Sequence, residues 1–183
     1  MYKHVLGISL LLVASGVQAD SVQQSRIVVK NFMGELKSEL VAAMKSGGPV
    51  NAIDVCNIKA PAIAEEMSKK HGVKISRTSL KLRNQANKPD AWELKVLNRF
   101  ETRKTKGENV KNMEFSEVVS QKGKNVFRYM KAIPTGKPCL NCHATEIEPA
   151  VISKLSKLYP QDKARGFKLG DIRGAFTLSK AVE

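Results

Sequence analysis

The amino-acid sequence predicts an α+β fold in which helices flank an antiparallel sheet. Before residue 72, apolar side chains recur at the three- and four-residue spacing of amphipathic helices. Later runs are rich in β-branched residues, and two of them flank a short turn that contains glycine, as in a β-hairpin. Helices followed by successive strands are typical of α+β domains.

The first helix is expected over residues 21–45. Gly47-Gly48-Pro49 should end it, because glycine and proline both disfavour a helix interior. Pro49 suits the first turn of a second helix, whereas Pro61 would force a kink or a new start, and Gly72 closes this part of the chain. The apolar stripe of the first helix comprises Val29, Phe32, Met33, Leu36, Leu40, Val41 and Met44.

The middle of the chain is predicted to hold one strand, one loop and one helix. Residues 73–80 have β-branched content and partial alternation, which indicates a strand. Residues 81–88 are polar and should form a loop. Pro89 then opens a helix that runs through Phe100 and ends among basic residues, which suit the negative end of a helix dipole.

The last third is predicted to contain the hairpin, a helix and a closing strand. Residues 112–120 and 125–133 should pair across the intervening turn, and residues 134–138 should be extended. A helix is expected over residues 149–159, because a proline opens it and apolar residues follow at helical spacing. The closing strand is expected over residues 170–178.

Residues 1–19 are predicted to be a secretory signal peptide, followed by a single domain over residues 20–183. Lys3 precedes a short apolar run, and small residues lie before Asp20. A membrane anchor is the alternative, but the apolar run is shorter than the roughly 18 residues that a spanning helix needs. We therefore expect a periplasmic protein whose mature chain has no transmembrane segment.

The composition is strongly basic. The formal net charge of +14 becomes +13 when residues 1–19 are removed, because they carry one lysine and no acid. Such a charge is compatible with acidic partners, anionic ligands or lipid headgroups, but a well-solvated lysine-rich surface is the favoured explanation. Nucleic acid is disfavoured, since an exported protein rarely meets it and the basic residues are scattered.

The segment Cys139-Leu140-Asn141-Cys142-His143 carries the functional prediction. Two thiols separated by two residues and followed by an imidazole are typical of one covalently attached haem c: each sulfur adds to a vinyl group, and His143 binds the iron. A redox dithiol and half of a zinc site are the alternatives. A dithiol normally lies where a helix begins after a strand, and zinc needs two more soft ligands with suitable spacing. The motif therefore favours haem.

The candidates for the second axial ligand of the iron are found by counting the remaining cysteine, histidine and methionine side chains. Cys56 is left without a disulfide partner once two cysteines hold the haem, although many free cysteines are simply small buried hydrophobes. His71 is the other imidazole of the mature chain and resembles an exposed helix end. Composition mildly favours Cys56. The remaining alternatives are the thioethers of Met33, Met44, Met67, Met113 and Met130.

Several short segments occur in an informative order. They are Ile53-Asp54-Val55-Cys56-Asn57 with Ala60-Pro61, Ser76 to Asn84 with Asn87 and Pro89-Asp90, the Cys139 to His143 motif, Tyr159-Pro160, and Gly170-Asp171-Ile172-Arg173-Gly174-Ala175. Together they resemble a bacterial family of c-type haem domains of unassigned function, which occur as free periplasmic proteins or as sensory modules. The resemblance implies a PAS-like fold with a five-stranded antiparallel sheet. It also implies that His143 and Cys56 bind the iron from opposite faces.

These features predict a monohaem c-type cytochrome in low-potential electron transfer or in redox or gas sensing. A thiolate from Cys56 would stabilise ferric iron and lower the potential, and carbon monoxide or nitric oxide could bind only after this ligand leaves. An acidic redox protein is the expected partner. The alternative is a haem enzyme, a peroxidase or nitrogen-oxide reductase, with an open iron face. Arg77, Arg83 and Arg173 are candidate partners of the haem propionates.

Overall fold

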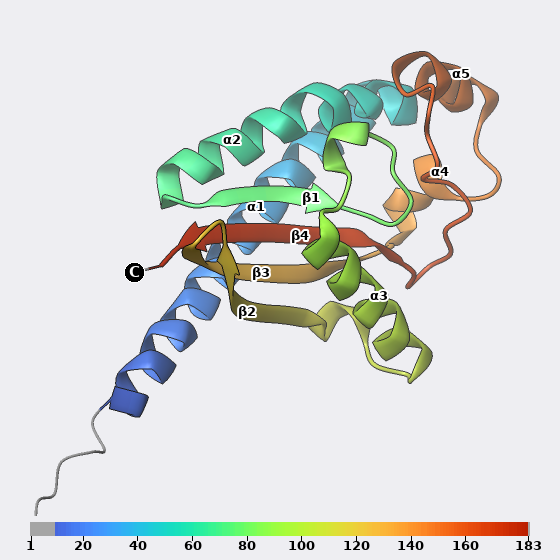
Figure 1. Cartoon of the computed structure of the whole chain (residues 1–183). Helices are drawn as coiled ribbons and strands as arrows, with labels where there is room; N and C mark the ends of the chain where they lie inside the picture. Colours follow the sequence, from blue (N-terminus) through green and yellow to red (C-terminus); the bar gives the residue numbers. More distant parts are fainter. Residues whose placement is uncertain (1–9, 183) are drawn as a thin grey trace, which may run out of the picture.

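The computed structural model describes residues 10–182, with side chains from residue 19 onward (Figure 1). Its elements in chain order are α1 (Leu10–Asp54), η1 (Val55–Lys59), α2 (Ala60–His71), β1 (Lys74–Thr78), η2 (Gln85–Asn87), α3 (Ala91–Thr105), η3 (Val110–Asn112), β2 (Glu114–Gln121), β3 (Lys124–Pro134), η4 (Lys137–Cys139), α4 (Leu140–His143), α5 (Pro149–Leu158) and β4 (Ile172–Ala181). The predicted α+β class and the order of helices and strands are confirmed.

The first helix is interrupted where the sequence predicted. Gly47 (φ −157°, ψ 19°) and Gly48 (φ 67°, ψ −164°) leave helical geometry, and Pro49 begins the following helical segment within α1. Gly48 adopts a positive φ that only glycine tolerates easily, so the break is encoded locally. Because the helix changes direction here, its last turns can pack against α5.

Pro61 has an effect that the sequence pattern only partly anticipated. The five residues Val55–Lys59 form a π-helical turn, and α2 starts after it with Pro61 in its first turn. Proline lacks an N–H, and its ring clashes with the carbonyl four residues earlier, so a wider turn relieves both problems. Single π turns inside helices are frequent at functional sites. The turn carries Cys56.

The sheet has four antiparallel strands in the order β1-β4-β3-β2. β1 pairs with β4 from Lys74↔Ser179 to Thr78↔Ala175, and β3 joins β4 to β2. The five strands implied by the family resemblance are therefore wrong for residues 10–182, whereas the four strand-forming runs read from the residues are all present. Residues 160–171 contain no strand; positive φ angles at Gly166 and Gly170 make this segment irregular.

Local sequence explains the ends of the other elements. Asp90 and Glu93 form a capping box that starts α3, and Gly72 ends α2 in the left-handed conformation. Lys122 and Gly123, between β2 and β3, both have positive φ. Two such residues match the twist of the flanking strands, so the hairpin closes tightly.

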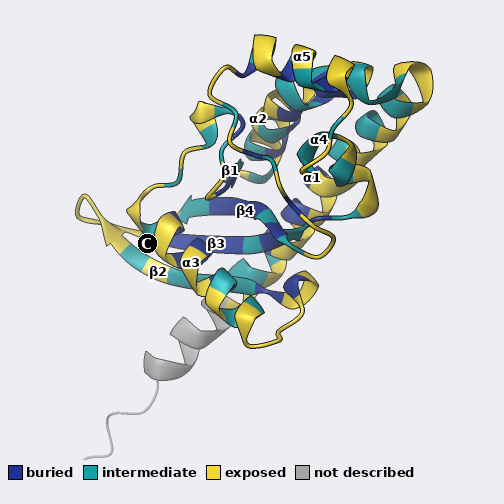
Figure 2. Cartoon of the chain, turned by 90° about the vertical axis from the view of Figure 1, so that its right-hand side faces the viewer, coloured by how far each residue is buried: buried dark blue, intermediate teal, exposed yellow. Residues whose placement is uncertain are grey.

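Two apolar layers cover opposite faces of the sheet. One joins α1 and α2 to the face that carries Phe127, Tyr129, Phe176 and Leu178. The other lies beneath α3, on the face that carries Met130 and its neighbours in β3 and β4. Figure 1 shows α3 on the opposite side of the sheet from α1, and Figure 2 shows that burial is concentrated in the middle strands.

A third, smaller apolar cluster lies beyond the end of the sheet. It joins Ile53 near the end of α1 to Val151, Leu155 and Tyr159 of the α5 region, with Cys142 packed against it. This cluster brings the π turn and the Cys-x-x-Cys-His segment together.

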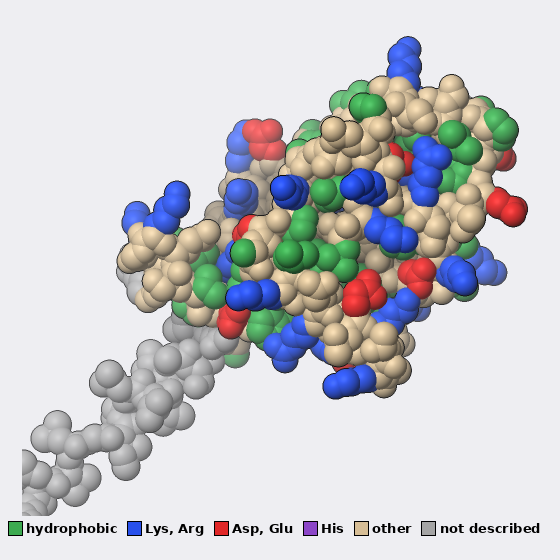
Figure 3. Space-filling view, turned by 45° about the vertical axis from the view of Figure 1, so that its right-hand side comes forward, with side chains coloured by type: hydrophobic (Ala, Val, Ile, Leu, Met, Phe, Trp, Pro, Cys, Tyr) green, Lys and Arg blue, Asp and Glu red, His purple; other side chains and the backbone are tan. Residues whose placement is uncertain are grey.

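The predicted signal peptide begins within residues 1–9, which lie outside the described residues, and α1 is already helical at Leu10. Of the helices in residues 10–182, none is long and apolar enough to cross a membrane. The described chain has mixed surfaces, and Figure 3 shows Lys and Arg side chains spread over one face rather than gathered in a single patch.

Candidate haem site

The Cys-x-x-Cys-His segment follows β3 and forms its own short helix. Cys139 ends the turn η4, and α4 spans Leu140–His143. The Gly136 N–H donates to the Cys139 sulfur over 3.4 Å, which fixes this side chain at the start of the helix. All three cysteines of the chain are free thiols of intermediate burial. The extended approach expected over residues 134–138 is present at residues 134–136 but wrong for Lys137 and Pro138, which already belong to η4.

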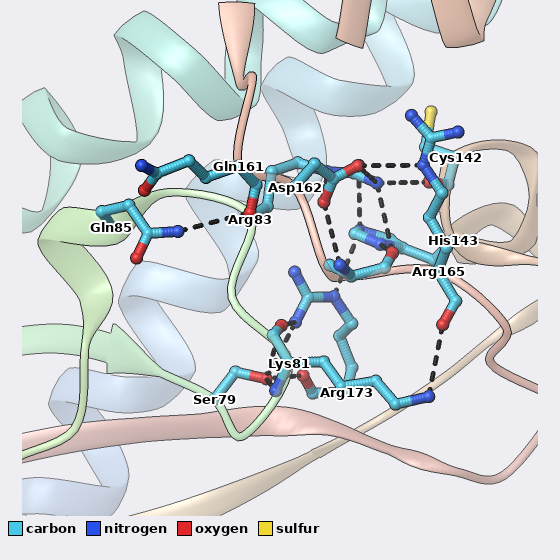
Figure 4. Close-up of polar contacts among 11 residues, drawn as sticks. Ser79, Lys81, Arg83, Gln85, Cys142, His143, Gln161, Asp162, Arg165 and Arg173 are labelled. Carbon is cyan, nitrogen blue, oxygen red and sulfur yellow. Dashed lines mark hydrogen bonds and ion pairs between the residues drawn. The ribbon is translucent and has the colours of Figure 1, made fainter. Parts of the chain in front are cut away.

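His143 is held in one tautomer by its neighbours. Its Nδ1 lies 2.7 Å from the Ala164 carbonyl, and its Nε2 lies 3.2 Å from Arg173 Nε and 3.5 Å from Arg83 Nη1 (Figure 4). A carbonyl can only accept and a guanidinium can only donate, so Nδ1 carries the proton and Nε2 presents its lone pair. A lone pair on Nε2 is what a metal-binding imidazole requires.

The electrostatic environment keeps this imidazole neutral. Burial and the positive charges of Arg173 and Arg83 lower the pKa of His143 to about 2. Burial, with Arg83 and Arg77 adding to it, likewise lowers the pKa of Arg173 to about 10. His143 is therefore an uncharged imidazole across the physiological pH range, and in this structure its Nε2 lone pair accepts from Arg173 Nε.

Arg83 and Asp162 form a buried ion pair next to His143. Arg83 Nε lies 3.1 Å from Asp162 Oδ1, and Nη2 lies 3.2 Å from Oδ2. Nη2 also donates to the Cys142 carbonyl (2.6 Å) and to the Ala164 carbonyl (3.2 Å). Asp162 and two main-chain carbonyls therefore occupy Nε and Nη2 of Arg83, whereas Nη1 has the single contact to His143. Whether Arg83 also pairs with a haem propionate stays a prediction.

The segment 162–167 lies along the end of the motif and satisfies its last carbonyl groups. The Phe167 N–H donates to the His143 carbonyl, and the Gly166 N–H donates to the Ala144 carbonyl. The Phe167 ring packs edge-on against the imidazole, with the ring centroids 6.0 Å apart. Three segments that are distant in the sequence thus lie side by side and form one wall of the candidate site, the motif wall (Figure 4). They are the segments around residues 79–83, 142–144 and 162–167.

Cys56 lies close to the same region. Its sulfur is within electrostatic reach of Cys142, Arg77, Arg173 and Tyr159. Burial is the main cause that raises the pKa of Tyr159 to about 12, with Cys56 adding to it. The structure therefore brings Cys56 to the motif although 83 positions separate Cys56 from Cys139 in the sequence.

Arg77 differs from the two other arginines. It projects from the face of β1 that also carries Ile75, because it pairs with Phe176 on that face. Burial lowers its pKa, and the described residues offer it no hydrogen bond or ion pair. Arg77, Arg83 and Arg173 act on one another electrostatically, and among the described residues Asp162 is the carboxylate that acts on Arg83 and Arg173, so the region carries an excess of positive charge.

The other candidate axial ligands lie elsewhere. His71 ends α2 beside the Lys74↔Ser179 end of the sheet, whereas the motif follows the Pro134 end (Figure 1). Met113 and Met130 lie under α3 on the far face, Met67 packs between α2 and the sheet, and Met33 is exposed. Met44 is half-buried in α1.

The described residues bear on the zinc alternative to haem. Among them, no group of three or more histidine, cysteine, aspartate or glutamate side chains could hold a metal, which argues against a structural zinc site. Burial raises the pKa of the Cys142 thiol, although the charge of Arg83 opposes this.

Two contributors to this wall were not found from the sequence. Asp162 and Phe167 lie in an irregular segment without a recognisable motif, and their roles depend on contacts with residues about eighty and twenty-four positions away. Ser79 was within a segment that carried the resemblance, and it bonds Arg173 at 3.1 Å. No local pattern would have singled out the first two.

Fold and site define an α+β domain in which a Cys-x-x-Cys-His helix, a neutral buried imidazole and a third cysteine meet beyond one end of an antiparallel sheet. A family model matches residues 13–180, and the chain belongs to the Tll0287-like family. The family resemblance drawn from the sequence is thereby confirmed.

One solved structure shares the fold. The crystal structure of the cyanobacterial haem protein Tll0287 aligns with a TM-score of 0.64 and 20% sequence identity, covering 90% of this chain and 94% of that one. A search of curated proteins gives no match.

Proposed function

We propose that the chain is a periplasmic c-type cytochrome that binds one haem covalently through Cys139 and Cys142, with His143 and Cys56 as axial ligands. The observation that carries the proposal is the Nε2 lone pair of His143, fixed by the Nδ1 bond to Ala164 immediately after the two thiols. Membership of the Tll0287-like family, and the fold shared with a haem protein, support it.

The residues present fit a haem. Two thiols at the right spacing are partly accessible, and the neutral imidazole offers its nitrogen. The excess positive charge of Arg77 and Arg173 complements a group that carries carboxylates. When bound, haem supplies one-electron redox chemistry at its iron.

Cys56 is the proposed second ligand because of where the π turn places it. It lies near the second motif cysteine, and Arg77 and Arg173 put positive charge beside its sulfur. Positive neighbours complement a negatively charged thiolate. An anionic ligand favours the ferric state, so we expect a low potential suited to electron transfer or redox sensing in a PAS-like domain.

Arg77 is the favoured propionate partner among the three arginines. It is the one without a hydrogen bond or ion pair among the described residues, whereas Arg83 is engaged by Asp162 and Arg173 by Ser79. Carboxylates in an apolar surrounding need such a donor. The acidic redox partner expected from the basic charge remains part of this proposal, as does binding of carbon monoxide or nitric oxide after loss of Cys56.

Replacing Cys56 by serine tests the ligand set. The wild-type ferric protein should show a six-coordinate low-spin spectrum with a thiolate near-infrared band, and the Cys56→Ser variant should lose that band. His71→Gln is the matched control and should leave the spectrum unchanged, because His71 lies at the other end of the sheet. A Cys56→Ser spectrum identical to wild type would contradict the assignment.

A further inference from the structure

Arg83 and Asp162 both contact Ala164, whose carbonyl accepts the hydrogen bond from His143 Nδ1. We infer that this buried pair is a positioning clamp, which fixes His143 and tunes the reduction potential of the haem that the proposed function assigns to it. The inference rests on that proposed function, but it concerns residues that neither the motif nor the family assignment singles out.

The clamp grips the chain on both sides of the imidazole. Arg83 Nη2 holds the carbonyl of Cys142, the residue before His143, at 2.6 Å. The same nitrogen holds the Ala164 carbonyl, which accepts from His143 Nδ1. One guanidinium therefore holds both the main chain just before His143 and the carbonyl that accepts from its imidazole.

Asp162 holds the N–H of Ala164, the residue whose carbonyl Arg83 holds. Its Oδ1 accepts from the Ala164 N–H at 2.9 Å while both carboxylate oxygens receive Arg83. The side chains of Arg83 and Asp162 are only 8% and 3% exposed, so solvent screens the pair weakly. A two-pronged guanidinium–carboxylate contact is also geometrically restrictive. Ala164 is thus held at its N–H and at its carbonyl.

Charge gives the clamp an electronic effect as well as a geometric one. A carbonyl that already accepts from a guanidinium is a poorer acceptor for the Nδ1 proton, so the imidazole stays close to neutral and donates less electron density. Removing Arg83 would strengthen the donation and delete a positive charge, and both changes favour ferric iron. Removing the charge of Asp162 would act in the opposite direction.

The chain offers a control in Arg128. Its side chain is also 8% exposed and pairs with two carboxylates, but it lies beside α3 on the far face of the sheet. Loss of Arg128 should destabilise the fold without moving the imidazole.

The test measures the reduction potential and the low-spin electron paramagnetic resonance spectrum of the loaded full-length protein. Arg83→Met should shift the ferric–ferrous equilibrium about tenfold towards ferric, ~59 mV for a one-electron couple. Asp162→Asn should shift it in the opposite direction, and the double variant should return close to wild type. Arg128→Met should change it less than about twofold.

A conservative variant separates charge from geometry. Arg83→Lys keeps the charge but not the planar fork, so its potential should stay near wild type while its low-spin signal broadens. If Arg83→Met does not retain haem, Asp162→Asn and Arg83→Lys decide the question.

The clamp would be contradicted if the ferric–ferrous equilibrium constants of Arg83→Met and Asp162→Asn both lay within twofold of the wild-type value. Shifts of both variants in the same direction would contradict it as well. Failure of the proposed ligand set would instead appear in the wild-type spectrum.

Discussion

Two buried arginines, Arg128 on the α3 face of the sheet and Arg83 in the loop after β1, have the same side-chain exposure and different surroundings. Arg128 of β3 pairs with Asp90 and Glu93 of the α3 capping box, and its guanidinium stacks on Trp92 at 4.3 Å. Arg83 pairs with Asp162 and also donates to main-chain carbonyls of the motif wall. The first pair ties a helix to a strand; the second holds the segment that contains His143, the proposed iron ligand.

The balance of charge separates the two clusters. Arg128 meets two carboxylates, so its cluster contains enough negative charge for the cation it buries. Arg83 shares Asp162 with Arg165, and Arg77 and Arg173 lie nearby. Burying unmatched charge is unfavourable, so a cluster with surplus cations indicates that an anionic group belongs there. Surplus positive charge, rather than burial alone, distinguishes the Arg83 cluster from the Arg128 cluster.

Removing Glu93 should give the largest loss of stability and should leave the haem site intact. Glu93 accepts from Arg128, from the Thr177 hydroxyl and from the Asp90 N–H, so Glu93→Ala breaks a buried network and should cost roughly 3–5 kcal/mol. Urea unfolding of the loaded protein measures this cost.

Its control is Glu65→Ala in an exposed ion pair with Lys69, which should barely move the unfolding midpoint. A changed haem spectrum in Glu93→Ala would contradict the expectation that the Arg128 cluster does not affect the haem site.

The fold was largely predictable because its signals are local. Gly47-Gly48-Pro49 stops a helix, Asp90 starts one, and Lys122-Gly123 closes a hairpin, each through its own backbone geometry. The π form of residues 55–59 was not predictable, since Pro61 allows either a kink or a new start and packing selects the outcome. The five-strand expectation came from the resemblance and not from the residues of this chain.

The sequence singled out four residues of the proposed site, which stay a prediction. Cys139, Cys142 and His143 stand out by their spacing, and Cys56 by lacking a disulfide partner once two cysteines are assigned to haem. The role of Arg83 was not predictable, because its partner Asp162 lies 79 positions further along the chain. An arginine without a visible acid nearby in sequence looks free to bind a propionate, and the structure shows it engaged.

Adding a methyl group at Gly174 should cause an intermediate loss of stability and should disturb the end of the sheet next to the Cys-x-x-Cys-His segment. A Cβ there would lie 2.3 Å from the Thr78 carbonyl oxygen and 3.1 Å from the Ser79 Cβ, so β1 and β4 must separate. Gly174→Ala should cost roughly 1–3 kcal/mol, as overpacking usually does. It should also alter the haem spectrum, because Ser79 holds the adjacent Arg173. Thermal unfolding and absorbance together check both effects.

The matched control is Gly34→Ala in α1, where a Cβ would meet nothing within 4 Å. This change should not lower stability, because alanine favours a helix interior over glycine. A spectrum unchanged in Gly174→Ala would mean that the motif wall tolerates movement of β4.

Acidification should give the smallest effect and should act on the motif side through Asp162. Burial raises the pKa of this carboxyl, but hydrogen bonds from Arg83 and the Ala164 N–H and the Arg83 charge outweigh it, so the pKa lies below its ordinary value of 3.8. A depressed pKa in the folded state stabilises the fold above pH 3.8, and this stability is lost as the pH falls through the lower folded value. Stability of the wild type, measured by urea unfolding between pH 6 and the acid transition, should therefore fall more steeply than that of Asp162→Asn, which has no carboxylate to protonate. If the stability–pH curves of the wild type and Asp162→Asn ran parallel, protonation of Asp162 would not be the source of the acid sensitivity.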